Sequence, residues 1–516
     1  MKRRQRVLVC ILSLVLMLAP MGGFNAGAEE AGVYPLDTDV KLTIWSSITG
    51  AASAYITSLS ENATVIAYQE ATGIDVEFIH PISGQGTESF NLLIATGTYP
   101  DIMCSSNYAG GVAAGVLDGV YADLTDYLPV YAPNYWSFVE NDPDFRKLAS
   151  TEEGRFNTLY NYKNQYEPYY YRTQFRQDLL DEFGMEIPLT LEEYEAYFEA
   201  VKANHPEMVP YALNNDGLEC SILCAWNIGE IRGSGSGCNW YVVDGEVQSG
   251  YYAPDLREYL ELMHTWYEKG YISTDFITES PGTLFKTGEA ASCSINGYSV
   301  FATMKELGIP MISGRYARIN PEDEIHTLRR YWPNNGGDTY ISGNADEETL
   351  EVALRFVDYG YTDDGILLMN FGPKGVSWDE VDEDGFPLYN DNILNNPELP
   401  MNNAEEILRL HGTGWARYRY GDKYCMATNQ KDPEAWAYRE RWGDDETVDN
   451  SYAMPPFTLS AEADERLAQI MTNVETHAEE MVLKYITGAA DLALFDTEYT
   501  AVLESFGIQE AIDIYQ

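Results

Sequence analysis

The chain has 516 residues, with 81 acidic and 32 basic side chains that give a formal net charge of −49. A surface this acidic repels nucleic acid and anionic lipid, so we expect no nucleic-acid partner and no polyanionic ligand unless a local basic pocket overrides the field. The length exceeds the roughly 250–300 residues at which a single core stops growing, which predicts two lobes.

The N-terminal 28 residues have the layout of a secretory signal. Four basic residues precede an apolar run from Val7 to Ala19, and a small-residue stretch ends at Ala28. This pattern predicts cleavage after Ala28 and a secreted protein, with an uncleaved anchor as the alternative. Cleavage removes four positive charges and no negative ones, which changes the net charge from −49 to −53. Cys10 lies inside the apolar run, where it is badly placed to carry a lipid. The cleavage site itself, from Asn25 to Glu29, contains no cysteine.

Strand and helix patterns alternate in the next part of the chain. The predicted order is strand, helix, strand, helix, strand over residues 40–45, 65–70, 73–79, 90–97 and 100–103. This alternation is typical of a parallel α/β layer. Such sheets bind ligands beyond the carboxyl ends of their strands, so Trp45, Asn107 and Tyr108 are candidate ligand-binding residues.

The rest of the chain is more helical. Apolar residues at helical spacing predict helices over 176–183, 190–201, 256–267, 347–359, 461–485 and 492–505. Thr190, followed three residues later by Glu193, has the spacing of a capping box. Asp244-Gly245 predicts the turn of a hairpin.

Six further side chains are candidate ligand contacts, because aromatic rings stack on the apolar C–H faces of a sugar, while carboxylate and guanidinium groups bind its hydroxyls. They lie where the chain is expected to cross between the lobes (Tyr170 and Arg172), at the return crossing (Trp332 and Asp338), after an apolar segment (Trp226) and after a glycine-rich loop (Trp378). The alternative for each ring is a place in the core.

One acidic segment partly resembles a calcium-binding loop. Glu380, Asp382 and Asp384 stand at alternate positions, with Asp391 at the twelfth. Leu388 occupies the ninth position, and the flanks also fit a hairpin turning at Asp384-Gly385, so a solvated turn is the favoured interpretation. The six cysteines beyond the signal are too dispersed for a disulfide scaffold, and no CxxC pair or histidine at metal spacing is present. We therefore assign no metal and no cofactor.

Several segments in order carry a family resemblance. They are Phe90-x4-Ala95-x-Gly97-x2-Pro100-Asp101-Ile102, Phe175-Arg176-x-Asp178-Leu179-Leu180 with Pro188-x-Thr190-x2-Glu193, Tyr259-Leu260 to Trp266-Tyr267-x2-Gly270, Leu354 to Asp358 with Asn370-Phe371-Gly372-x2-Gly375, and Phe495-Asp496-x2-Tyr499 with Gly507-Ile508. With these segments, which span almost the whole mature chain, the protein resembles the extracellular solute-binding proteins of family 1, in particular the LplA-like branch of Gram-positive bacteria.

This resemblance implies an α/β fold of the periplasmic-binding-protein-like type II, in which two α/β lobes joined by a multi-strand hinge close on a ligand in the cleft between them. The expected division is a signal peptide at 1–28, a tail at 29–40, an N-terminal lobe at 41–165 and 335–375, and a C-terminal lobe at 166–334 and 376–516. It further implies a monomer that is not an enzyme, that binds a sugar or oligosaccharide, and that delivers it to the permease subunits of an ABC importer.

Two alternatives remain open at this point. A secreted glycoside hydrolase needs two carboxylates about 5–10 Å apart across a sugar site, and a chain with 81 acidic residues always offers such pairs. The same fold with a peptide or another small solute is the second alternative. The resemblance is incomplete in one respect, because many members of the branch carry a lipidated cysteine at the cleavage site, where this chain has Asn25 to Glu29 without one.

Overall fold

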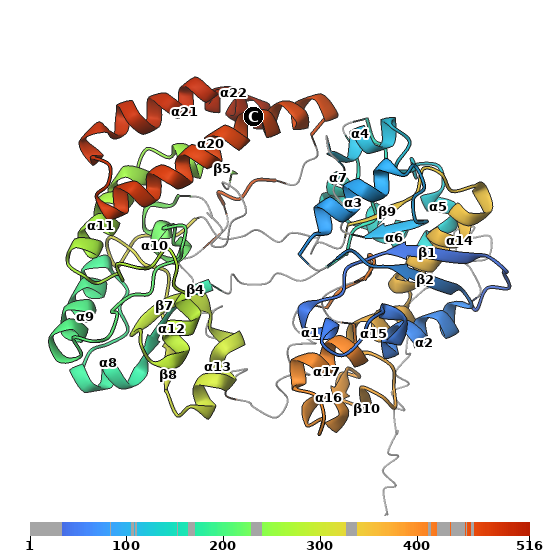
Figure 1. Cartoon of the computed structure of the whole chain (residues 1–516), viewed down its shortest axis with the longest axis horizontal. Helices are drawn as coiled ribbons and strands as arrows, with labels where there is room; N and C mark the ends of the chain where they lie inside the picture. Colours follow the sequence, from blue (N-terminus) through green and yellow to red (C-terminus); the bar gives the residue numbers. More distant parts are fainter. Residues whose placement is uncertain are drawn as a thin grey trace, which may run out of the picture.

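A computed structural model gives the architecture of the chain. It describes residues 34–516 except 83, 105–107, 109–110, 152, 164–170, 229–239, 327–337, 411–413, 421–433, 435–448, 450 and 456–458. Two lobes are visible, each with its own sheet and its own buried apolar cluster (Figure 1). In the part of the chain that the structure describes, no helix is long and apolar enough to cross a membrane.

The N-terminal lobe is built on a four-stranded sheet in the order β2-β1-β3-β9. Its strands are β1 (Lys41–Trp45), β2 (Asp75–Ile79), β3 (Ile102–Cys104) and β9 (Thr339–Ile341). β1 pairs in parallel with both β2 and β3, whereas β9 returns from later in the sequence and pairs antiparallel with β3. The parallel α/β layer predicted from the first three strands is therefore confirmed.

Helices cover both faces of this sheet, and their ends follow from local chemistry. The Asn62 side chain accepts hydrogen bonds from the first-turn amides of α2, and Gly73 ends that helix in the left-handed conformation at φ +73°. The helical elements are α1 (Gly50–Ser53), η1 (Leu59–Glu61), α2 (Ala63–Thr72), α3 (Gly86–Ala95), α4 (Gly111–Leu117), α5 (Leu128–Tyr131), α6 (Pro133–Asn141), α7 (Pro143–Ala149), α14 (Glu347–Asp358), η4 (Tyr359–Tyr361) and α15 (Asp363–Phe371).

The C-terminal lobe has a three-stranded antiparallel sheet in the order β7-β4-β8. Thr190 and Glu193 form the predicted capping box at the start of α9. The elements are β4 (Tyr171–Arg176), α8 (Gln177–Phe183), α9 (Leu191–Asn204), α10 (Cys220–Leu223), η2 (Cys224–Trp226), β5 (Trp240–Val243), β6 (Glu246–Ser249), η3 (Gly250–Tyr252), α11 (Leu256–Glu268), α12 (Pro281–Thr287), β7 (Ser292–Asn296), α13 (Gly297–Glu306), β8 (Met311–Ser313), α20 (Ala461–Thr487), η6 (Leu492–Leu494), η7 (Asp496–Thr500), α21 (Ala501–Phe506) and α22 (Ile508–Tyr515).

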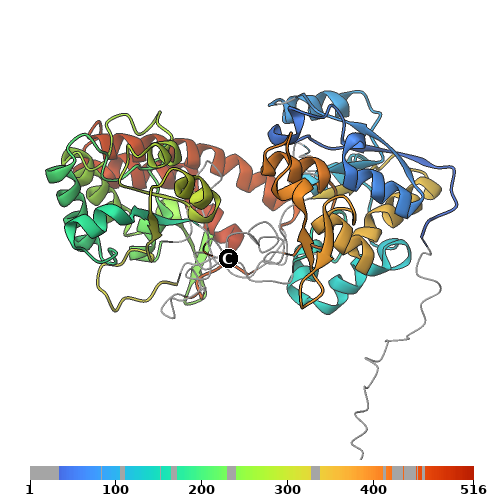
Figure 2. The same ribbon diagram turned by 90° about the horizontal axis from the view of Figure 1, so that it is seen from below.

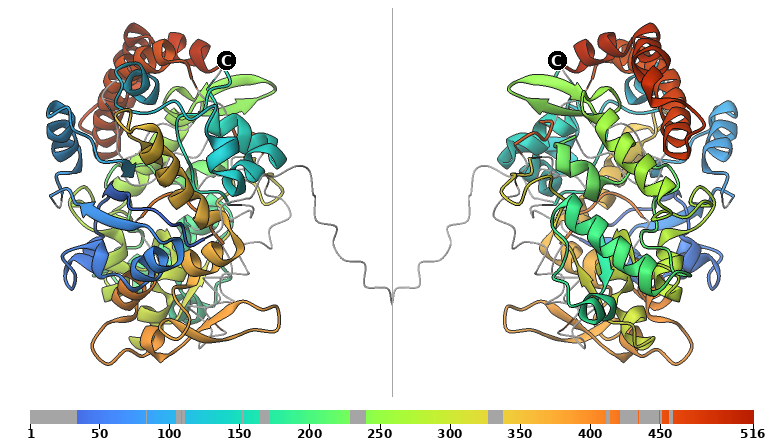
Figure 3. Two further views of the ribbon diagram at one scale, coloured as in Figure 1. Left: turned by 90° about the vertical axis from the view of Figure 1, so that its right-hand side faces the viewer. Right: turned by 90° about the vertical axis from the view of Figure 1, so that its left-hand side faces the viewer.

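The segment after α15 packs on the N-terminal lobe, which corrects the expected boundary at residue 376. It contains β10 (Trp378–Val381), β11 (Pro387–Tyr389), α16 (Asp391–Leu394) and α17 (Met401–Leu408), drawn in orange at the edge of that lobe (Figure 1, Figure 3). α17 packs on α1 and α2, and the fully buried Trp415 contacts Tyr68 and Phe356. This segment joins the N-terminal lobe because its apolar side chains are buried against the core of that lobe. The order of residues along the chain does not reveal this packing.

The last predicted helix, over 492–505, is interrupted in the structure. A 3₁₀ turn at Leu492–Leu494 and a wide π turn at Asp496–Thr500 precede the regular helix α21. Phe495 and Tyr499 are both buried and stack with their ring centroids 4.7 Å apart. The irregular turns place both rings in the core of the C-terminal lobe, at the cost of regular helical hydrogen bonding.

The described residues show that the chain passes between the lobes three times. It leaves the N-terminal lobe after 163 and enters β4 at 171, returns between 326 and 338, and leaves again between 420 and 449. On the N-terminal side, three segments lie together: Leu159 and Thr339 exchange backbone hydrogen bonds at 2.9 Å, and Tyr162 pairs with Tyr418. Several parallel links of this kind are typical of a hinge between lobes.

Candidate ligand-binding site

The N-terminal lobe presents one carboxylate and two tyrosines beside the crossings. Asp338 is the first described residue after the second crossing and directly precedes β9, where Tyr340 lies. Tyr160 lies on the neighbouring segment, because the backbone amides of Leu159 and Thr339 each donate a hydrogen bond to the other residue's carbonyl oxygen. The side-chain hydroxyl of Thr339 accepts a hydrogen bond from the amide of Ala416 at 2.9 Å, which ties the third segment to the same place.

Burial is the main influence on the pKa values of this group. Burial raises the pKa of Asp338 above its ordinary value, and among the described residues no cation forms an ion pair with it. Burial and then the charge of Asp338 raise the pKa of Tyr160 to about 12, and the same two causes raise the pKa of Tyr340. A half-buried carboxylate beside neutral phenol groups can accept hydrogen bonds from the hydroxyls of a ligand.

The C-terminal lobe carries a second polar group, where the second crossing begins and the third crossing ends. The amide of Asp449 donates to the carbonyl oxygen of Ile325 at 2.7 Å, and the amide of Tyr452 donates to that of His326 at 3.1 Å. The His326 ring lies 3.1 Å from the Asp449 carboxylate and 5.0 Å, between centroids, from the Tyr452 ring. The side chain of Asn227 accepts from the His326 amide at 2.8 Å, so the group is fixed to the lobe that carries it.

Two of the predicted contacts are buried within their lobes. Trp45 is 6% exposed and packs in a small cluster with Phe90 and Met103, under α3. Arg172 is 2% exposed, with its guanidinium carbon 4.5 Å from the centroid of the Tyr316 ring. Phe90 of α3 packs on Trp45 at the end of β1, whereas Arg172 lies at the start of β4 and packs against Tyr316, so both side chains are core residues of their lobes.

Three other predicted contacts have partners at the surface of their own lobes. The Trp226 indole donates to Glu258 at 2.9 Å, and the Trp378 indole donates to the carbonyl oxygen of Gly372 at 2.9 Å. The Tyr108 hydroxyl donates to Asp118 at 2.7 Å. Of the nine predicted contacts, Asp338 is therefore the one that the structure places beside the crossings with no ion pair among the described residues. Asn107, Tyr170 and Trp332 lie outside the described residues.

The acidic segment considered for calcium is a hairpin turn. One carboxylate oxygen of Asp382 accepts from the amides of Asp384 and Phe386, at 3.0 and 2.8 Å. Glu380 lies in β10 opposite Leu388, and Asp391 begins α16. Across the ranges that the structure describes, no group of three or more His, Cys, Asp or Glu side chains is arranged to hold a metal ion.

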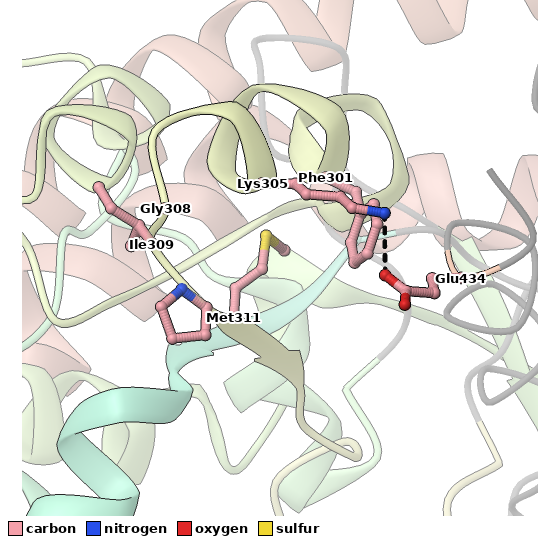
Figure 4. A pocket seen from close by; sticks show the side chains of 7 residues that line it. Phe301, Lys305, Gly308, Ile309, Met311 and Glu434 are labelled. Atoms are coloured by element: carbon pink, nitrogen blue, oxygen red, sulfur yellow. Dashed lines mark hydrogen bonds and ion pairs between the residues drawn. The ribbon is translucent and has the colours of Figure 1, made fainter. Parts of the chain in front are cut away.

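A separate hollow of about 450 Å³ lies on the C-terminal lobe between α13 and β8 (Figure 4). Phe301, Ile309, Pro310 and Met311 give it apolar walls. Lys305 reaches across its mouth to Glu434, with Nζ and the carboxylate oxygen 2.9 Å apart. The ion pair joins α13 to a residue of the third crossing, so this hollow borders the region between the lobes.

Sequence patterns missed most of the residues beside the crossings. Tyr160, Tyr340, His326 and Tyr452 belong to no motif, and only their nearness to the expected crossings could have selected them. Three of the four are tyrosines in a chain that has 39, so residue type alone could not distinguish them from core rings.

Comparison with known proteins identifies the class. Residues 63–369 match the model of the bacterial extracellular solute-binding proteins, and the chain belongs to that family. It is 22% identical over 354 residues to the lipoprotein LipO of Bacillus subtilis (strain 168), covering 61% of this chain and 64% of that protein. It is 21% identical over 393 residues to a carbohydrate ABC transporter substrate-binding protein of Streptococcus pneumoniae serotype 4 (strain ATCC BAA-334 / TIGR4), covering 72% of each.

Solved structures show the same fold. The alginate-binding protein AlgQ2, crystallised without calcium ion, superposes with a TM-score of 0.73 at 18% identity, covering 93% of this chain and 98% of that one. An EF-hand mutant of the S. pneumoniae ABC-transporter substrate-binding protein FusA, in complex with fructo-nystose, gives 0.72 at 16% identity, covering 92% and 98%. The fold is therefore periplasmic-binding-protein-like of type II, as the resemblance implied.

Proposed function

We propose that this protein binds a neutral sugar or oligosaccharide between its two lobes and delivers it, chemically unchanged, to the permease of an ABC importer. The observation that supports this most directly is the Asp338 carboxylate, flanked by Tyr160 and Tyr340 at the base of the crossings and without an ion pair among the described residues. The carbohydrate named for one relative and the fructo-nystose bound by one structural neighbour agree with this ligand class.

The energetic demand on such a site is modest. Micromolar affinity corresponds to about −8 kcal/mol, which two or three stacked rings and several hydrogen bonds can supply. The ligand favours the closed arrangement only by its differential affinity for that arrangement. Recognition from both lobes, by the Asp338 group and by the His326 group, provides this difference, because a ligand contacts both only when the lobes are close.

The proposal includes a location. The mature protein begins after Ala28, acts as a monomer at the extracellular face of the membrane and meets the permease there. Catalysis is not part of the proposed function.

The test is a calorimetric titration of the mature protein, first with a panel of neutral oligosaccharides and separately with peptides. Asp338→Asn keeps the shape and removes the charge. A hydrogen bond to a charged group contributes about 1.5–3 kcal/mol, so we expect affinity for the bound sugar to fall roughly 10- to 100-fold. Asp346→Asn is the matched control, since Asp346 caps α14 at the surface and asparagine caps a helix equally well.

Two outcomes would contradict the proposed function, and a third would place the binding site elsewhere. Binding of peptides in preference to every sugar would change the ligand class. If chromatography detected shorter sugars after prolonged incubation with an oligosaccharide, the protein would be a glycoside hydrolase. Equal affinities for wild type and Asp338→Asn would remove Asp338 from the site while leaving solute binding itself intact.

A further inference from the structure

A buried asparagine of the N-terminal lobe holds the chain where the third crossing leaves that lobe. Asn370, in the last turn of α15, is 3% exposed. Its carboxamide donates to the carbonyl oxygen of Tyr418 at 2.9 Å and accepts from the amide of Tyr420 at 3.0 Å. Tyr162 of the first crossing forms a parallel backbone bridge with Tyr418. The Asn370 carboxamide therefore supplies the two hydrogen bonds that one residue of a further parallel strand would supply.

An asparagine of the C-terminal lobe holds the second crossing in the same way. Asn227 lies directly after η2, in the left-handed conformation at φ +51°. Its carboxamide donates to the carbonyl oxygen of Glu324 at 3.0 Å and accepts from the amide of His326 at 2.8 Å. The carbonyl oxygen of Ile325, between them, accepts from the amide of Asp449 at the end of the third crossing. One carboxamide again pairs with backbone groups two residues apart, as a parallel strand does.

These bonds fix the direction in which each crossing leaves its lobe. Backbone amides and carbonyl oxygens at the edge of a ladder have no protein partner unless another group supplies one. Each asparagine supplies both bonds from a single planar group that is rooted in its own lobe. The two lobes stand side by side as separate bodies in both views (Figure 1, Figure 2). The exits of the crossings therefore influence how the lobes face each other, as expected of a hinge.

Both carboxamides are connected to the candidate site by short paths. Asn227 holds the amide of His326 itself, so it fixes the polar group of the C-terminal lobe directly. The segment that Asn370 holds also donates a hydrogen bond to the side chain of Thr339, the residue after Asp338. One asparagine thus stabilises the position of each polar group that we assign to the sugar site.

We propose that Asn370 and Asn227 are positioning residues of the sugar site, which fix the exits of the third and second crossings and so hold the Asp338 and His326 groups in the arrangement that a ligand bridges. This inference rests on the proposed function. Without either carboxamide the lobes adopt a wider range of orientations. The apparent affinity then falls by the factor by which the binding-competent fraction falls.

The test compares matched pairs of variants. Glycine adopts positive φ without strain, so Asn227→Gly removes the carboxamide and leaves the backbone conformation in place. Asp244→Gly is its control, because Asp244 has φ +54° in the exposed turn of the β5–β6 hairpin. Asn370→Ala tests the other lobe. Its control is Asn204→Ala, which removes a side chain that donates to the carbonyl oxygen of Ala200 within α9.

Two quantities are measured for each variant. The first is the affinity for the bound sugar, by calorimetric titration. The second is the distribution of distances between the lobes without ligand, by pulsed electron paramagnetic resonance, with spin labels on unnatural amino acids at the exposed positions Glu140 and Glu192. We expect Asn227→Gly and Asn370→Ala each to broaden this distribution and to weaken binding roughly 10-fold, while both controls match wild type.

The outcomes separate a positioning role from a structural one. A structural role lowers the urea midpoint and leaves affinity and distance distribution unchanged, and that result overturns the inference. Distance distributions identical to wild type in both variants also overturn it, and so does a broader distribution with unchanged affinity. If the wild type binds no sugar, the proposed function fails, whereas the distances still report whether the asparagines fix the lobes. Circular dichroism checks folding, and each variant carries the test should the other fail to fold.

Discussion

Glu219 provides a test of how burial controls the stability of the C-terminal lobe. Its side chain is 1% exposed, accepts a hydrogen bond from the Asn214 side chain at 3.1 Å, and forms no ion pair within the described part of the chain. Burial is the main cause that raises its pKa to about 8, while the nearby Ser294 hydroxyl opposes this shift and the charge of Asp216 adds to it. At neutral pH the folded protein therefore holds this carboxyl group in its protonated form.

The magnitude follows from linkage. In the unfolded chain a glutamate has a pKa near 4.5, so between about pH 4.5 and pH 8 the folded state binds one proton that the unfolded state has released. The free energy of unfolding then falls by about 1.4 kcal/mol per pH unit, because stability decreases with pH wherever the native state binds more protons. The stabilisation is complete below the unfolded pKa, and roughly 3–5 kcal/mol is lost as pH rises to the folded pKa.

Glu219→Gln removes this dependence, because glutamine has the shape of the neutral acid and keeps its hydrogen-bonding capacity. We expect the variant to match wild type near pH 5 and to exceed it by roughly 3 kcal/mol or more near pH 8, in urea unfolding followed by circular dichroism. The control is Glu186→Gln, at an exposed position. Stability curves for Glu219→Gln and wild type that run parallel from about pH 5 to pH 8 would refute the reasoning.

Two further substitutions test local contacts. Asp358 is buried and accepts from the amide of Tyr135 at 2.8 Å and from the Asn134 side chain at 2.6 Å, so Asp358→Ala should lower the free energy of unfolding by about 1–3 kcal/mol by leaving buried donors unpaired. An unchanged urea midpoint would contradict this expectation. Thr190→Ala removes half of the capping box of α9 and should cost about 1 kcal/mol, whereas Thr190→Ser should restore most of it; equal melting temperatures for the two variants would show that the cap is not needed.

Features that depend on neighbouring residues could be predicted from the sequence. The alternation in residues 40–45 and 73–79 reappears as β1 and β2, in parallel register with Lys41 opposite Asp75. The Thr190–Glu193 capping box and the turn at Asp384-Gly385 form as their spacing indicated. Each rests on hydrogen bonds or side-chain directions set within a few residues, so the residue types alone determine it.

Tertiary packing decided which of the candidate residues are buried in the core. Trp45 stands at the predicted strand end, yet α3 covers it, because both faces of a parallel sheet are buried under helices. The segment from β10 to α17 joins the N-terminal lobe because that lobe offers an apolar surface to bury it. The helix α20 packs on α4 of the N-terminal lobe only because its 27 residues are enough to cross between the lobes. The sequence by itself determined the class of protein and its local elements, whereas contacts between distant segments, which depend on mutual burial, were decided only by the folded structure.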